Sequence, residues 1–170
     1  MSRSRTIVAV LALLPAVLAA QQGPPPGCDQ PAQRQFDFWV GSWTVTDSAG
    51  RVTFGTSSVT NEERGCLIHE HWSGSKGGTG QSLNYFDLSK GQWEQDWVAS
   101  TAGGMVHLYG HLENGAMVLE GDQVKAGVSS RQKVMWIPEP DGRVRQFWQQ
   151  SVDGGKTWTV AFDGWYRRTG

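Results

Sequence analysis

The sequence contains little that would support a helical fold, a membrane-spanning protein or a nucleic-acid-binding protein. Apolar residues do not recur at helical spacing, and runs of Ala, Leu, Glu and Lys are scarce. After residue 20, no apolar run approaches the roughly 20 residues that a membrane span requires. The 15 basic and 16 acidic residues form no basic stripe. We therefore expect neither a membrane span nor a nucleic-acid partner.

The common catalytic motifs are also absent. The sequence has no G-x-S-x-G, no H-E-x-x-H and no Walker loop. The stretch KGGTG (76–80) is a glycine-rich turn without the spacing of a phosphate-binding loop. No reaction can be read from these patterns, so the sequence favours a protein that is not an enzyme.

The first residues resemble a secretory signal peptide. Arg3 and Arg5 provide the positive start, Ile7 to Leu18 form a short apolar run, and Ala19 and Ala20 offer a cleavage site. Export to the periplasm or the medium is therefore expected. Residues 21–33 are rich in proline and glycine and predict a flexible lead-in. Residues 34–170 have the length of a single domain, and nothing in them indicates an oligomeric state.

Two cysteines follow this signal, Cys28 and Cys66. In an oxidising compartment they are expected to form one disulfide. In the alternative, Cys66 is a small buried apolar residue and Cys28 is a free thiol.

The sequence is rich in the residues of strands and turns, with nine tryptophans and 22 glycines. A short helical turn is expected around 33–38, and turn signals then recur every 8–14 residues. Asn114-Gly115 and Asp141-Gly142 are the clearest tight turns. Between the turns lie ten extended segments, at 42–47, 52–60, 66–72, 81–86, 93–100, 105–112, 116–121, 131–137, 143–151 and 158–168.

Ten consecutive strands with short loops predict an all-β, antiparallel up-and-down meander. A sheet of this length tends to close on itself, because closure removes its edges. A closed barrel of ten strands leaves room for a ligand. A two-sheet sandwich is the alternative, although no long crossover connection is visible.

One hairpin carries a more specific pattern, S-x-D-x-G-x-T-W, from Ser151 to Trp158. It resembles the Asp boxes that recur in sialidases. In such a hairpin, Asp153 is expected to accept hydrogen bonds from loop amides while Trp158 packs beneath the turn. Because the pattern occurs once, we interpret it as a structural element and not as evidence of sialidase activity.

Gly41-x-Trp43 on the first strand, with basic residues at the end of the last strand, resembles the calycin superfamily of lipocalins and fatty-acid-binding proteins. The resemblance implies that Trp43 closes one end of the barrel beneath either Arg167 or Arg168. The chain also resembles a group of exported bacterial proteins of unknown function. The shared segments are 37–43, 65–72, 82–87, 144–148 and 153–164. This second resemblance implies a calycin-like fold and export, and no activity.

Alternation along three strands groups tryptophan with polar side chains on one face. If these faces point inward, they suit a small, partly apolar ligand with flat faces and polar edges. In an alternative, the same cavity is that of an isomerase, cyclase or hydrolase in which Glu70 acts as acid or base. In another, the barrel is filled by its own side chains and serves as a structural or interaction module. The candidate ligand-binding residues are Glu70, Trp72, Trp93, Gln95, Trp97, Gln146, Trp148 and Gln150.

His69 and His71 share the opposite face of the same strand as Glu70. Their imidazoles could approach one zinc ion, but the sequence supplies no obvious third ligand. No cofactor is predicted, with zinc at these histidines or haem on a single histidine as the alternatives.

Overall fold

The computed structural model describes residues 27–101 and 103–169. The predicted signal peptide and residues 21–26 of the lead-in therefore lie outside the described residues. Among those described, no helix is long and apolar enough to cross a membrane. The elements are the 3₁₀-helices η1 (Pro31–Arg34), η2 (Asp37–Trp39) and η3 (Glu63–Gly65), and the strands β1 (Gly41–Thr46), β2 (Thr53–Glu62), β3 (Leu67–Gly74), β4 (Thr79–Asp87), β5 (Gln92–Ala99), β6 (Met105–Glu113), β7 (Ala116–Lys125), β8 (Val128–Pro138), β9 (Val144–Ser151) and β10 (Thr159–Arg168).

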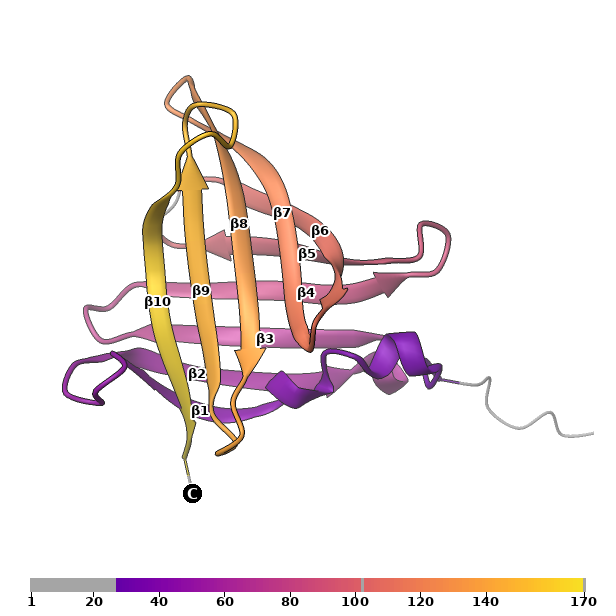
Figure 1. Ribbon diagram of the computed structural model, residues 1–170. Coiled ribbons are helices and arrows are strands. Elements are labelled where there is room, and N and C mark those ends of the chain that lie inside the picture. The colour runs from indigo at the N-terminus through magenta and orange to yellow at the C-terminus, as the bar shows by residue number, and fades with distance from the viewer. Residues whose placement is uncertain (1–26, 102, 170) are drawn as a thin grey trace, which may run out of the picture.

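The ten strands form a closed antiparallel barrel in which each strand pairs with its neighbours in the chain. The barrel closes between β1 and β10, from Trp43 opposite Arg168 to Thr46 opposite Trp165. In Figure 1, β8, β9 and β10 run nearly upright while β2 to β5 lie across them. The all-β, ten-stranded up-and-down barrel expected from the sequence is thus confirmed.

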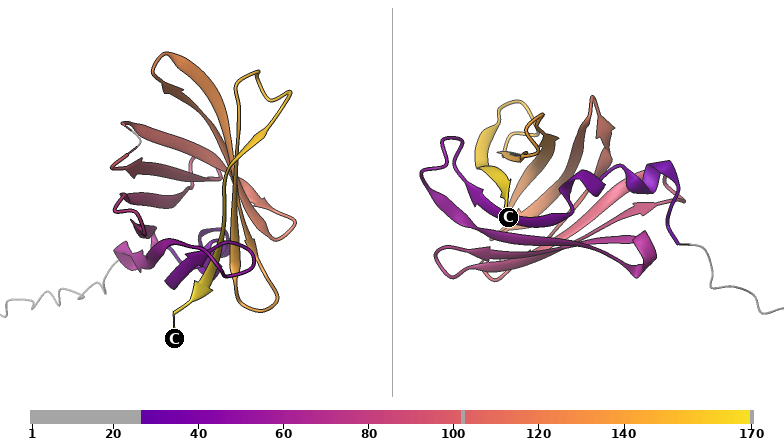
Figure 2. Two further views of the ribbon diagram at one scale, coloured as in Figure 1. Left: turned by 90° about the vertical axis from the view of Figure 1, so that its left-hand side faces the viewer. Right: turned by 90° about the horizontal axis from the view of Figure 1, so that it is seen from below.

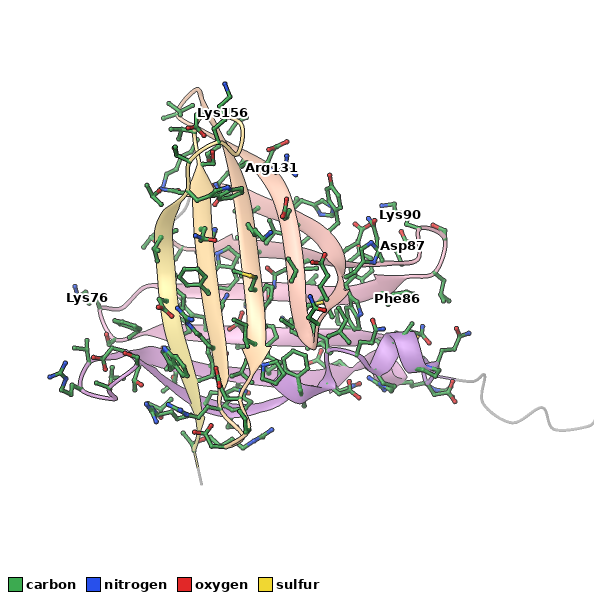
Figure 3. The ribbon with its side chains drawn as sticks, viewed as in Figure 1. Lys76, Phe86, Asp87, Lys90, Arg131 and Lys156 are labelled. Carbon is green, nitrogen blue, oxygen red and sulfur yellow. A yellow bond between two sulfur atoms is a disulfide. The ribbon has the colours of Figure 1, made fainter. Side chains whose placement is uncertain are left out.

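The barrel has two different ends. The turns β1–β2, β3–β4, β5–β6, β7–β8 and β9–β10 surround one end, which we call the open end. Lys76 and Lys156 mark it at the left and top of Figure 3, whereas Lys90 lies in the β4–β5 turn at the opposite, closed end. The segment carrying η1 and η2 crosses this closed end, as the view from below in Figure 2 shows.

Aromatic side chains from the η2 region fill the closed end. Phe36, Trp39 and Trp43 are at most 1% exposed. Phe36 and Trp39 pack against Trp136 of β8, with ring centroids 5.2 and 5.4 Å away. The Trp43 Nε1–H donates to the Trp39 carbonyl at 2.9 Å, and the guanidinium of Arg168 lies 4.4 Å from the Trp43 ring. These contacts form an aromatic plug, and of the two candidate arginines it is Arg168 that covers it.

Arg167 has another role at the same seam. Its Nε donates to Thr46 Oγ1 and its Nη2 to the Ser48 carbonyl, each at 3.0 Å. It therefore joins the end of β10 to the β1–β2 turn, on the outside of the barrel.

A disulfide ties the leading segment to the start of β3. Cys28 and Cys66 are bonded, and the Cys28 amide donates to the Arg64 carbonyl at 3.1 Å. The β2–β3 turn between them has positive φ at Glu63 and Arg64. The disulfide thus fixes both the lead-in and this strained turn.

The β9–β10 hairpin has its own hydrogen-bond network around Asp153. The carboxylate accepts from the amides of Lys156 and Thr157 at 3.0 and 2.9 Å. The Trp158 Nε1–H donates to the Gly155 carbonyl at 3.1 Å beneath the turn. The hydroxyl and then the amide of Thr157, which both donate to this carboxylate, are the main causes of the lowered pKa of Asp153. The hairpin at the open end is therefore ordered by its own side chains.

Two sequence predictions need correction. The helical turn expected around 33–38 is two short 3₁₀-helices, η1 and η2, with a break between them. The sequence predicts that one strand ends at residue 121 and the next begins at residue 131, but β7 continues to Lys125 and β8 begins at Val128. The connecting turn is only Ala126-Gly127, with positive φ at both residues. The polar composition of 121–125 belongs to an exposed strand extension, not to a loop.

Candidate functional site

The interior contains a cavity of about 380 Å³ that opens toward the open end. This volume falls within the range of small-molecule pockets, about 300–1,000 Å³. The aromatic plug closes the other end, so the cavity occupies the remaining part of the barrel. Its lining combines aromatic rings with amide side chains and one carboxyl group. The lining residues are Glu70, Trp72, Gln95, Trp97, Val106, Gln123, Lys125, Gln132, Val134, Gln146, Trp148, Gln150, Ala161, Phe162 and Tyr166.

The tryptophan-bearing faces of β3, β5 and β9 point inward, an orientation that alternation alone left open. Seven of the eight sequence-predicted residues line the cavity, namely Glu70, Trp72, Gln95, Trp97, Gln146, Trp148 and Gln150. Trp93 does not. It packs edge-on against Phe36 of the plug, and its Nε1–H donates to Gln35 Oε1 at 3.2 Å. Its position near the closed end makes Trp93 a core residue.

Glu70 lies at the floor of the cavity and is 3% exposed. Its carboxyl group accepts hydrogen bonds from Ser57 Oγ at 2.8 Å and from Ser82 Oγ at 3.2 Å. Tyr166 OH is 3.2 Å from Glu70 Oε1 and 2.6 Å from Gln146 Oε1. Burial raises the pKa of Glu70 to about 7, against the lowering effect of these hydrogen bonds. Burial and the neighbouring carboxyl raise the pKa of Tyr166 as well.

Glu70 forms no ion pair with any residue that the structure describes. Two basic residues of the barrel, Arg145 and His107, bind other carboxylates. Arg145 forms a two-pronged contact with Asp163 at 2.8 Å. His107 binds Asp96 through Nδ1 at 2.7 Å on the outer face of the barrel. A buried carboxyl held only by neutral hydroxyl groups is therefore the most polar feature of the cavity floor.

The aromatic walls are fixed by hydrogen bonds and by close packing. Trp148 Nε1–H donates to Gln132 Oε1 at 2.7 Å, and Gln132 Nε2 donates to a serine hydroxyl. Gly80 lies under the Trp97 ring, where an added Cβ would be 2.4 Å from it. The Trp72 ring meets Phe162 edge-on, with centroids 6.3 Å apart. Flat indole surfaces are thus held in place before any ligand arrives.

Sequence reasoning missed several lining residues. Gln132 and Tyr166 lie on the inward face of their strands, as the buried Val134 does two residues after Gln132. Strand periodicity could therefore have found them. Phe162 precedes the G-W-Y-R-R end and shares the inward face with Tyr166. Gln123 and Lys125 lie between the predicted strand segments 116–121 and 131–137, and no local signal places them at a cavity mouth.

The two histidines of β3 lie on the outer face of the barrel. His69 and His71 have ring centroids 4.1 Å apart. Glu62, at the end of β2, joins them, and one ligand atom of each residue lies within 4.8 Å of the others. The sequence did not indicate Glu62 as a third group, because its proximity depends on the pairing of β2 with β3.

Neither a protein family nor a curated protein matches the chain by sequence. The chemistry of the site must therefore be judged from its own geometry. The cavity can hold a molecule between indole rings and offer it amide donors and acceptors. Its floor also places a carboxyl group and a phenol side by side.

Proposed function

We propose that this protein is an exported, calycin-like barrel that binds a small, partly apolar ligand in its interior cavity. The observation that carries the proposal is the cavity of about 380 Å³ between Trp72, Trp97 and Trp148. A barrel that served only as a structural module would fill this space with its own side chains. Fixed indole rings with amide groups at their edges favour a flat molecule with polar substituents.

Export is supported by two independent features. The signal-like residues 1–20 carry the pattern of secreted precursors. The Cys28–Cys66 disulfide suits the periplasm or the extracellular medium, because thiols in the cytosol are kept reduced. The calycin-like assignment is supported by barrel closure, the Gly41-x-Trp43 start and the Arg168–Trp43 contact.

The test is native mass spectrometry of the mature protein purified from its host, beside a denatured control. A small molecule that is retained only in the native sample is expected, and its mass gives the ligand class. Trp148→Phe should reduce the retained fraction. Trp165→Phe should not, because that ring lies outside the barrel against Arg143 and Arg145.

Two results together would refute the proposed binding function. One is a clean apo mass for the protein taken from its host. The other is tryptophan fluorescence that does not respond to a broad panel of metabolites. The barrel would then be a structural or interaction module.

A second candidate is an enzyme that uses the same cavity. The specific observation is that the Glu70 carboxyl and the Tyr166 hydroxyl are 3.2 Å apart at the floor, where both can reach a bound molecule. Such a pair can move a proton to or from a substrate. Glu70→Gln would then abolish turnover of the recovered ligand while changing its affinity modestly. If the protein only binds its ligand, the wild type and Glu70→Gln should both leave that ligand chemically unchanged.

A further inference from the structure

The outer faces of β2 and β3 bring together three groups that commonly ligate metals, away from the cavity. Glu62 is the last residue of β2, and His69 and His71 lie on the neighbouring strand β3. Thr60 of β2 pairs with His69, which brings Glu62 close to the two histidines. One ligand atom from each of the three side chains lies within 4.8 Å of the other two. Two imidazoles and one carboxylate form a donor set that zinc and its neighbouring transition metals accept.

One distance in this cluster already matches a metal site. His69 Nδ1 and Glu62 Oε2 are 3.3 Å apart. Two atoms bound to a tetrahedral zinc ion at about 2.0–2.1 Å lie about 3.3–3.4 Å from each other. The His71 side chain is exposed, so it can rotate toward the same point without displacing core residues.

The surrounding hydrogen bonds orient the ligands as they do in metal sites. His69 Nε2 is 3.0 Å from Gln81 Oε1, and the Thr60 hydroxyl donates to Glu62 Oε1 at 2.6 Å. A metal-bound histidine usually donates its other ring N–H to an oxygen acceptor. When Nε2–H donates to Gln81, the lone pair of Nδ1 faces the Glu62 carboxylate. In this arrangement both the Nδ1 lone pair and the carboxylate oxygen are available to a metal ion.

The backbone that carries Glu62 and His69 is held rigidly. The β2–β3 turn lies directly between these two ligands, and the Cys28–Cys66 disulfide and the Cys28 amide bond to Arg64 both anchor it. A turn fixed in this way lowers the cost of assembling the site, because the ligands are positioned before the ion arrives.

We propose that Glu62, His69 and His71 bind one divalent transition-metal ion, with Zn²⁺ as the fitting ion, on the outer face of the barrel. Three protein ligands leave one tetrahedral position for water or for an outside ligand. Because Glu70 points to the opposite face of β3, the metal site and the interior cavity are separate. Either site can therefore exist without the other.

The proposal is tested on the mature, disulfide-bonded protein without a histidine tag, stripped with EDTA and titrated with ZnCl₂ by calorimetry. One equivalent of Zn²⁺ should bind. His71→Ala and Glu62→Gln should each weaken Zn²⁺ binding more than about tenfold. Gln81→Ala removes the supporting amide and should lower the Zn²⁺ affinity by about tenfold or more. The matched control is His111→Ala, because His111 is exposed on the outer face of β6 and should leave the affinity unchanged.

The same protein with Co²⁺ gives a second readout. Visible absorption bands of a tetrahedral Co²⁺ complex should appear in the wild type and disappear in His71→Ala, while the circular dichroism of both proteins remains the same. The absence of stoichiometric Zn²⁺ binding overturns the proposal. Binding that survives all three substitutions, or that depends on His111, also overturns it, since the ion would then lie elsewhere.

Discussion

Replacing Glu70 by glutamine is expected to change how the stability of the barrel depends on pH. The Glu70 carboxyl is fully buried, accepts hydrogen bonds only from neutral hydroxyl groups and forms no ion pair within the described residues. Burial without a counter-charge disfavours the ionised form. The pKa of Glu70 is accordingly raised from 4.5 to about 7 in the folded protein.

The sign of the effect follows from proton linkage. The folded state binds the Glu70 proton more tightly than the unfolded state does, so the carboxyl contributes its full stability below pH 4.5. That contribution is lost as the pH rises from about 4.5 to about 7 and stays lost above it. At about 1.36 kcal/mol for each tenfold change in proton affinity, the loss is about 3 kcal/mol. Glutamine has a similar shape and carries no charge at any pH.

The assay is urea unfolding of the wild type and Glu70→Gln between pH 5 and pH 8, with the disulfide intact and a chelator present. The free energy of unfolding of the variant minus that of the wild type should rise by about 2.5 kcal/mol across this range, because part of the loss has already occurred at pH 5. Glu113→Gln is the control, because its side chain is exposed and its difference from the wild type should stay flat. Parallel profiles for Glu70→Gln and the wild type would refute the reasoning and indicate that water reaches the carboxyl.

Three further outcomes are expected. Replacing Cys28 and Cys66 by alanine opens a cross-link that spans 38 residues. By the chain-entropy relation this should lower the free energy of unfolding by about 4 kcal/mol, and an unchanged urea midpoint would contradict it. Arg168→Met should lower the free energy of unfolding by about 0.5–1 kcal/mol in the same assay, because the guanidinium contact with Trp43 is lost. An unchanged value would mean that the exposed guanidinium contributes nothing to stability. Asp153→Ala should abolish hydrogen-exchange protection of the two loop amides that its carboxylate binds, and retained protection would show that the backbone alone orders the hairpin.

The barrel itself could be predicted because its signals are local. Alternation marks each strand, and turns such as Asn114-Gly115, with positive φ at both residues, connect neighbours without crossovers. Seven cavity residues were found for the same reason, since residues two apart on a strand share a face. Which face lies inside is a property of the closed sheet, and alternation cannot supply it.

The remaining features depend on position along the barrel and on register between strands. Trp93 and Trp97 share one face of β5, yet only Trp97 reaches the cavity, because the plug occupies the depth of Trp93. Lys125 reaches the mouth because the β7–β8 hairpin continues beyond the point where its composition becomes polar. Glu62 meets His69 through pairing across a turn, which no spacing within one strand reveals.

The polar groups of the cavity divide into two sets, and this division predicts how a ligand would lie. At the floor, side chains bond one another: Ser82 donates to Glu70, and Gln95 donates to Asn84 at 2.7 Å. At the mouth, Gln123 has no side-chain hydrogen bond to any described residue. A bound molecule therefore finds its open hydrogen-bonding groups at the mouth and its flat surfaces deeper in. Gln123→Ala should weaken retention of the ligand with little loss of stability, whereas Ser82→Ala should lower the urea midpoint and largely preserve retention. The opposite pattern would place the polar end of the ligand at the floor, against Glu70.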